Sequence, residues 1–372
     1  MALDLTTFAS ALKQHYTSDR IENMVYKDNP LLALLAKYEN FGGKNLPLPI
    51  KYGIPQGRSA AFATAQSNKT SSQFKDFLLT RDKDYSLASI DNETIEASKG
   101  NANAFIEAAT TEIDGAIESA TRSLAIALYG TGSGSIGQVS AGFTGTSFTL
   151  SDVEDVTNFE VGMEIVFSTA DGGGSVKSGT ITVNGVNRDS GVITVDAGSA
   201  IDGGTGPATS DYVFVEGDYD QKIKGLLAWL PSTAPTSGDS FFGVDRSVDA
   251  SRLAGIRFDG SSQPIEEALV GAASRVAREG GKPDYCFMSY SKFADLEKAL
   301  GSKVQYIDAH ANAEVGFRGM MIHGPRGPIK VIPDQNCPSS RAFMLSMSFW
   351  KLYSLGKCPK ILDSDGLKFI GS

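Results

Sequence analysis

The chain has 372 residues, of which 41% are hydrophobic and 21% are charged, and its net charge is −9. This composition is ordinary for a folded protein and excludes intrinsic disorder. An apolar run of about 18 residues or more is absent, which excludes a membrane-spanning helix. The N-terminus has Asp4 early and no uncharged apolar block, so we expect no signal peptide.

The negative charge is concentrated in one segment. Residues 138–216 contain eleven acidic residues and only two basic ones, Lys177 and Arg188, so the rest of the chain is balanced. A sequence-specific nucleic-acid-binding protein would instead show a basic face. The charge distribution therefore disfavours that class and predicts a neutral body with an acidic appendage.

Residues 1–40 are predicted to form an amphipathic helical arm. Pro30 is well placed to begin a short helix, with Asp28 or Asn29 as its cap. The first two dozen residues have no large apolar face, so we expect an arm that needs a neighbour, with a frayed terminus as the alternative.

Residues 41–90 are predicted to form a long two-stranded excursion. Strand-like runs at 45–52 and 74–81 flank a weakly apolar tip, and another strand is expected at 85–90. Because an isolated hairpin is marginally stable in water, this one is expected to lie on another surface.

Residues 103–129 have the spacing of one long helix. Apolar side chains recur at steps of three and four, from Ile106 to Leu128, and Gly130 follows where a C-terminal cap is expected. The helix would be roughly 40 Å long, so it resembles a strut to which the other segments attach.

Residues 138–216 are predicted to form a small β-barrel or sandwich. Five short strand patterns are separated by glycine-rich turns: 147–150, 164–167, 179–186, 191–195 and 211–215. The glycine-rich stretch 129–137 before them is expected to be a flexible join. This arrangement indicates an insertion into a host fold.

The remaining chain is predicted to be mixed α and β, which gives an α+β class. Helices are expected at 263–279 and 290–300, around a strand at 283–289. Strand patterns dominate after Val304, and the predicted strands are 317–323, 329–332, 342–345 and 350–355.

The sequence contains no catalytic motif. Cys286, Cys337 and Cys358 are widely spaced and are expected to be buried free thiols, and the three histidines do not complete a zinc site. The glycine-rich run 130–134 follows a helix rather than a strand, which disfavours a phosphate site.

Three further groups of polar residues have ordinary surface explanations. Asp308 and His310 are expected to be surface loop residues. Asp152, Glu154 and Asp155 lack the ligand spacing of a calcium loop, so a solvated acidic face is expected. Lys69 and Lys75 are expected to be solvated, with a partner contact as the alternative.

The order of these segments resembles the major capsid proteins of tailed bacteriophages with the HK97 fold. The matching features are the helical arm, the extended loop, the long helix ending in Leu128 to Gly134, and the C-terminal runs 316–320, 327–334, 342–345 and 350–352. The resemblance divides the chain into a 1–40 arm, a 41–90 extended loop, a 91–137 spine helix of the peripheral domain, a 138–216 β-rich insertion, a 217–260 return to the body, a 261–345 axial domain and 346–372 C-terminal peripheral strands.

The resemblance implies a structural protein of the virion, assembled in the bacterial cytoplasm, with no enzymatic activity, cofactor or metal. Hexamers and pentamers would tile an icosahedral shell around double-stranded DNA that is contacted non-specifically, without a membrane. Scaffold, portal and decoration proteins are the implied partners. The candidate contacts between subunits are Arg58, Lys69, Lys75, Phe77 and Arg81.

Three alternatives stay open at the level of sequence. An encapsulin-like nanocompartment shares the fold but encloses enzymes. A β-rich hydrolase with a carbohydrate-binding insertion would need a catalytic set that the sequence does not show. A tail or decoration protein is the third alternative.

Overall fold

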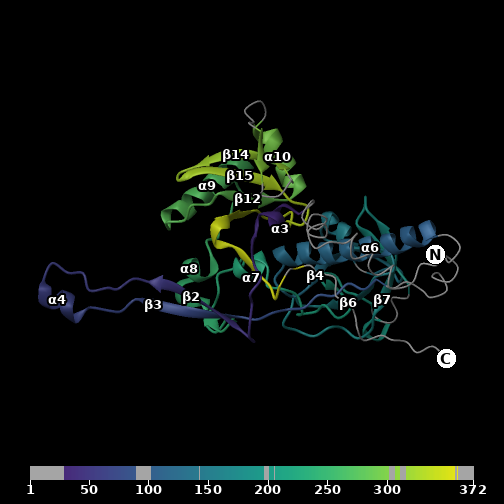
Figure 1. Ribbon diagram of the computed structural model, residues 1–372, viewed down its shortest axis with the longest axis horizontal. Coiled ribbons are helices and arrows are strands. Elements are labelled where there is room, and N and C mark those ends of the chain that lie inside the picture. Colours follow the sequence, from purple (N-terminus) through teal and green to yellow (C-terminus); the bar gives the residue numbers. More distant parts are fainter. Residues whose placement is uncertain are drawn as a thin grey trace.

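The computed structural model describes residues 29–88, 102–141, 143–196, 201–204, 206–300, 306–310, 316–356 and 358. Three bodies surround the long helix α6: a projecting hairpin, a five-stranded sheet with two helices, and a closed β-barrel (Figure 1). Most of the predicted 1–40 arm lies outside the described residues. Its described end contains α3 (Pro30–Leu34), which begins at the predicted proline, and strand β1 (Ala36–Tyr38).

Helix α6 spans Ala102–Tyr129 and confirms the helix predicted at 103–129. Ile117 and Leu128 of the predicted apolar stripe are buried in the central core, where Phe287 and Ile332 of the five-stranded sheet also lie. Gly225 lies so close to the end of α6 that a Cβ there would collide with backbone carbonyl groups of the helix. The helix is therefore fixed to the body by its C-terminal half.

The five-stranded sheet has the order β13-β14-β15-β12-β16. Its strands are β12 (Tyr285–Met288), β13 (Tyr306–His310), β14 (Gly316–Gly324), β15 (Gly327–Pro333) and β16 (Phe343–Leu345). Residues 306–310 pair with β14, so Asp308 and His310 lie on a strand. The prediction that they are loop residues was wrong.

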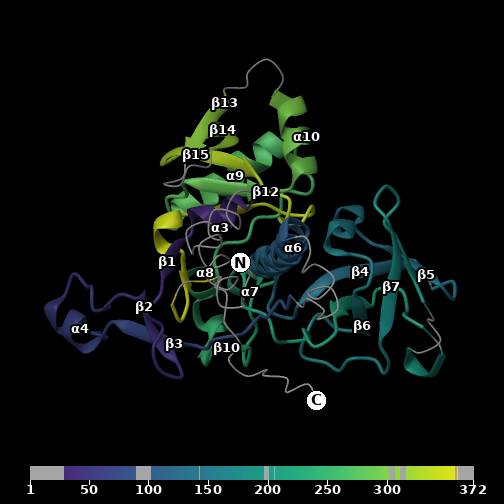
Figure 2. The same ribbon diagram turned by 45° about the vertical axis from the view of Figure 1, so that its right-hand side comes forward.

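Helices α9 (Ile265–Arg278) and α10 (Tyr290–Leu300) cover one face of this sheet (Figure 2). Alternation along β12 explains the layering: Cys286 and Met288 pack with Leu269 and Leu296 of the helices, whereas Phe287 points to α6 on the other face. The chain continues through η7 (Met347–Phe349) into β17 (Lys351–Tyr353), which pairs in parallel with β1.

The hairpin consists of β2 (Leu46–Gly53), α4 (Phe62–Ser67) and β3 (Gln73–Leu79), and it projects far from the rest of the chain (Figure 1). The two strands were predicted, and α4 at the tip was not. The strand predicted at 85–90 was wrong for its described part, because residues 85–88 pair with no strand and Leu87 is 92% exposed. Ser89 and Ile90 lie outside the described residues.

The base of the hairpin packs on the segment that returns from the barrel. That segment contains α7 (Leu226–Trp229), β10 (Ser240–Phe241), β11 (Val244–Asp245), η5 (Arg246–Asp249) and α8 (Ala250–Ala254). The N–H of Leu78 donates to the carbonyl oxygen of Phe242 at 3.0 Å, so one edge of the hairpin is already hydrogen-bonded at its base.

The acidic segment folds as a closed barrel of six strands in the order β4-β5-β8-β7-β6-β9. The strands are β4 (Ser135–Ala141), β5 (Ser147–Leu150), β6 (Glu164–Ser168), β7 (Ile181–Asn187), β8 (Val192–Val195) and β9 (Tyr212–Val215), with short helices η2 (Val153–Asn158) and η4 (Asp202–Gly204). Phe148, Phe159 and Phe167 fill a core separate from the others.

Strand β4 corrects the expected flexible join. It begins at Ser135, inside the glycine-rich stretch, and Ser135 pairs with Phe214 of β9. The glycines before it allow a backbone conformation that other residues rarely adopt, because Gly132 and Gly134 have φ of 93° and 85°. They do not indicate mobility. The end of the join, from Ser135 onward, is therefore part of the barrel wall.

Candidate functional site

The outer face of the hairpin exposes several large apolar side chains. Phe62 is 83% exposed, Ile54 62% and Phe74 59%. The opposite face is covered by the chain itself, since Leu48 and Ile50 of β2 pack on the core beneath the hairpin. The hairpin thus has one face used within the chain and one left for another surface.

The predicted contact residues fall on both faces. Arg58 and Lys69 are exposed at the tip, and Lys75 is half-buried on β3. The guanidinium of Arg81 lies 5.4 Å from the ring centre of Phe41 and remains exposed. Phe77 is 0% exposed, so its assignment as a contact between subunits was wrong. Its side chain points into the chain's own core.

Aromatic rings and one buried arginine fix the base of the hairpin. The Phe77 ring lies 5.4 Å from Trp229 and 6.3 Å from Phe241, centre to centre. The Arg246 guanidinium stacks 4.1 Å from the Phe241 ring centre, and its Nη1 donates to the Ala228 carbonyl oxygen at 2.8 Å. Burial lowers the pKa of Arg246. These contacts fix the direction in which the hairpin projects from the segment that contains Trp229 and Phe241.

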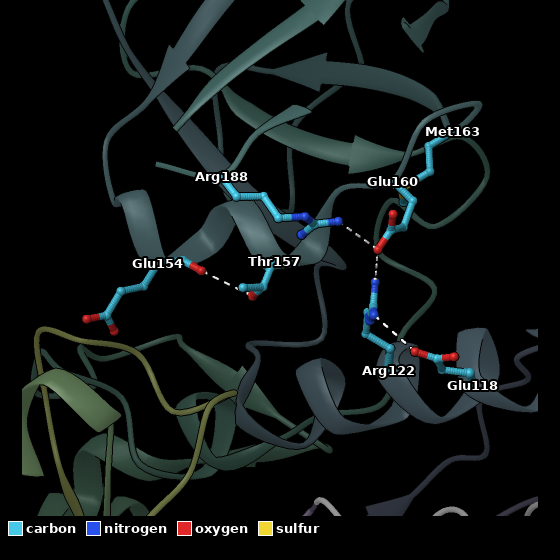
Figure 3. A network of polar contacts seen from close by, with 7 residues as sticks. All are labelled: Glu118, Arg122, Glu154, Thr157, Glu160, Met163 and Arg188. Carbon is cyan, nitrogen blue, oxygen red and sulfur yellow. Dashed lines mark hydrogen bonds and ion pairs between the residues drawn. The ribbon is translucent and has the colours of Figure 1, made fainter. Parts of the chain in front are cut away.

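An ion-pair network joins the barrel to α6 (Figure 3). Arg122 of α6 donates to the Glu160 carboxylate at 2.5 Å and to Glu118 at 3.3 Å. Arg188, on the barrel, reaches the same Glu160 oxygen at 3.0 Å. The hydrogen bond from Arg122, followed by the charges of both arginines, lowers the pKa of Glu160. The network links the barrel to α6 through Glu160.

Further polar contacts fix the join itself. Lys222, which is nearly buried, binds Asp84 at 2.9 Å and Asp218 at 3.0 Å. The backbone N–H groups of Gly173 and Gly174 donate to Asp220 and to the Tyr219 hydroxyl, each at 2.8 Å. No sequence pattern indicated the contacts of Gly173 and Gly174, because their partners are 47 and 45 residues away along the chain.

A cleft of about 980 Å³ lies between α6, the barrel and residues 335–341. Its lining is strongly acidic. The carboxylates are Asp84, Glu118, Asp152, Glu154, Asp155, Glu160, Asp171, Glu216 and Asp218, against only Arg122, Lys222 and Arg341. The acidic excess predicted for 138–216 therefore gathers partly at the joint with the body.

Asp155 is the most perturbed carboxyl group of the cleft. Burial, followed by the charges of Asp152 and Glu154, raises its pKa to about 7. Asp152 accepts a hydrogen bond from Ser339 on the opposite wall, whereas the Asp155 carboxylate has no hydrogen-bond partner among the described residues. Because its folded pKa is higher than 3.8, charging Asp155 opposes folding.

We expect Asp155→Asn to stabilise the protein at about pH 8 by roughly 1–3 kcal/mol and to have little effect at about pH 4. The penalty is absent below the ordinary pKa of 3.8, grows as the pH rises, and is complete above about 7. Thermal unfolding followed by circular dichroism across this range measures it, with the exposed Asp189→Asn as the matched control. An effect independent of pH would contradict the assignment.

A buried polar cluster ties the arm, α6 and the sheet together. Asp334 accepts hydrogen bonds from the Tyr129 hydroxyl at 2.8 Å, the Asn336 N–H at 3.0 Å and the Leu31 N–H at 3.4 Å. The amide of Asn336 donates to Asn29 at 3.0 Å. Burial raises the pKa of Asp334, and these hydrogen bonds oppose the shift. The cluster contributes to folding and offers no access to a substrate.

The described residues contain no group of three or more His, Cys, Asp and Glu side chains placed to hold a metal ion. Cys286 and Cys337 are buried free thiols, while Cys358 is only half-buried, contrary to the expectation. Burial raises the pKa of Cys286 to about 12, so its reactive thiolate is disfavoured. In the described part of the chain, every helix is too short or too polar to cross a membrane.

The family model described as SU10 major capsid protein matches residues 206–365. This match supports a phage major capsid protein. It runs from the last barrel strand through α7–α10 and the whole five-stranded sheet, so the capsid-protein similarity rests on the body rather than on the hairpin or α6. No curated protein matches the chain.

Proposed function

We propose that this capsid protein assembles into hexamers and pentamers of an icosahedral phage head that encloses double-stranded DNA. The observation that carries the proposal is the projecting hairpin, whose outer face exposes Ile54, Phe62 and Phe74. A two-stranded projection with exposed apolar side chains is stabilised when a second surface covers them. In a shell of identical subunits, a neighbouring copy supplies that surface.

We also propose that the subunit has the HK97 fold. The hairpin then corresponds to the extended loop, α6 to the spine helix, and the sheet with α9 and α10 to the axial domain. The barrel is proposed to be an insertion facing outward. Its separate core and the pairing of Ser135 with Phe214, which brings its two ends together, support this.

The proposed partners follow from the same function. Scaffold, portal and decoration proteins would act during and after shell assembly, in the host cytoplasm and in the virion. DNA would be contacted non-specifically by the inner surface. The balanced charge of the chain outside 138–216 is compatible with a shell that does not bind DNA tightly.

Light scattering and electron microscopy of the purified chain test the proposal. We expect closed shells or sheet-like assemblies, with the barrel on the outer surface. A protein that stays monomeric even with a scaffold supplied would refute the shell function. Shells with the barrel inside would refute only its outward placement. Particles from infected cells filled with protein instead of DNA would favour a nanocompartment.

A further inference from the structure

The barrel contains the only Asn-Gly pair of the sequence, Asn184-Gly185, which lies within β7 (Ile181–Asn187). The side-chain amide of an asparagine changes chemically when a nucleophile reaches its carbonyl carbon, Cγ. The nearest such group along the chain is the backbone nitrogen of the next residue. Glycine hinders that approach least, because it has no Cβ. Asn184-Gly185 is therefore a candidate for covalent change.

A β-bulge leaves Asn184 without a partner on the neighbouring strand. Val183 pairs with Val195, and Gly185 pairs with Thr194, the residue directly next to Val195 on β8. Asn184 is thus the extra residue of β7, and the ladder of the two strands is disrupted where it lies. The backbone around the pair is therefore held less firmly than in a regular strand.

The Asn184 side chain faces solvent. Val183 is buried in the barrel core and Val186 packs against the same core, although the two are three positions apart. Regular alternation would place Gly185 in the core instead, so the bulge accounts for the exposed position of Asn184. Among the residues that the structure describes, none forms a hydrogen bond with the Asn184 side chain.

Asn187, at the end of the same strand, differs in both respects. It is exposed too, but its Oδ1 accepts hydrogen bonds from the N–H groups of Asp189 and Ser190, each at 3.1 Å. The next residue is Arg188, whose side chain obstructs the backbone nitrogen. Asn187 is therefore an internal control for the reactivity of Asn184.

We propose that Asn184 deamidates spontaneously in the folded barrel through a cyclic imide with Gly185. The backbone nitrogen of Gly185 attacks Cγ of Asn184 and forms a new C–N bond. The bond from Cγ to the amide nitrogen breaks, and ammonia leaves with the proton that the Gly185 nitrogen gives up. Because the reacting groups belong to adjacent residues, the chain itself supplies their proximity.

Water then opens the imide at either carbonyl. One opening gives aspartate, and the other gives isoaspartate, in which the main chain continues through the side-chain carbon. Overall, the amide and one water become a carboxylate and an ammonium ion. Each modified chain gains one negative charge in the segment 138–216, which already has eleven acidic residues and two basic ones. This inference goes beyond the proposed shell function and does not depend on it.

Peptide mapping of the full-length folded chain tests the proposal. The chain is incubated at mildly alkaline pH and then digested with trypsin, which cleaves after Lys177 and Arg188 and releases residues 178–188 with both asparagines. We expect mass spectrometry to show conversion at Asn184 into aspartate and isoaspartate, while Asn187 stays intact. Isoelectric focusing of the whole chain should show the added negative charge.

Gly185→Ala is the matched variant. An added Cβ at Gly185 would lie 3.5 Å from the Cβ of Thr194, an ordinary contact, so the barrel should fold normally. The new Cβ obstructs the attacking nitrogen, and we expect the conversion of Asn184 to slow by about tenfold or more. Circular dichroism checks the fold of the variant.

Four results would overturn the proposal. An unchanged peptide 178–188, or equal conversion of Asn184 and Asn187, would show that Asn184 is not a special site. Conversion in the urea-unfolded chain but not in the folded chain would show that the barrel protects it. Equal rates in the wild-type and Gly185→Ala chains, or aspartate without isoaspartate, would exclude the imide route.

Discussion

Replacing Phe77 by alanine is expected to lower the free energy of unfolding by about 3–5 kcal/mol. The ring is 0% exposed and lies between Trp229 and Phe241, so its loss leaves a cavity lined by rigid aromatic groups. Urea unfolding followed by tryptophan fluorescence measures the loss. Because Trp229 and Trp350 are the only tryptophans, a Trp350→Phe background assigns the signal to Trp229 beside the hairpin.

Phe74→Ala is the matched control on the same strand. The Phe74 ring is 59% exposed, so the free energy of unfolding should change by less than about 0.5 kcal/mol. The effects on particle assembly should have the opposite order. Phe74→Ala should reduce assembly more than Phe77→Ala, since Phe74 lies on the uncovered face and Phe77 does not. Equal destabilisation by the two changes would show that the hairpin is not anchored through Phe77.

Local periodicity explains which elements could be predicted. The α6 stripe repeats at helical spacing from Ile106 to Leu128, roughly six turns. Tertiary packing on the sheet reinforces its C-terminal part, so sequence and structure agree. The strands of the barrel alternate between core and solvent and are bounded by glycine turns. Strand β4 was missed because its glycines suggested flexibility, whereas its partners on β5 and β9 fix it as a strand.

The hairpin shows what local sequence patterns cannot predict. Its two strands were predictable, but alternation alone cannot say which face is buried, because that depends on Trp229 and Phe241, more than 150 residues away. Phe77 was therefore placed among the contact residues together with Arg58 and Lys69. The strand expected at 85–90 failed similarly, since a strand needs a partner and none lies beside residues 85–88.

The buried cluster around Asp334 had no signal in the sequence, because Leu31 and Asp334 are 303 residues apart. Its position explains why an acidic residue is tolerated in the core. The carboxylate satisfies two backbone N–H groups and the Tyr129 hydroxyl, which would otherwise be buried without an acceptor. Asp334 is therefore the point at which the arm, α6 and the sheet are joined.

Asp334→Ala is accordingly expected to destabilise the body by about 3–4 kcal/mol, since it leaves two buried donors and one half-buried donor without their acceptor. Tyr129→Phe removes only one donor and should cost about 1 kcal/mol. Fluorescence of Trp350, which packs against the same core, follows the urea transition in a Trp229→Phe background.

Asp334→Asn sharpens the test, because it keeps the side-chain shape and one carbonyl acceptor without the buried charge. It should lie between the other two variants, at about 1–2 kcal/mol. If Asp334→Ala were no worse than Tyr129→Phe, the N–H groups of Leu31 and Asn336 would have to find other acceptors. The arm would then be attached to α6 by apolar packing of Leu31 and Leu32 alone.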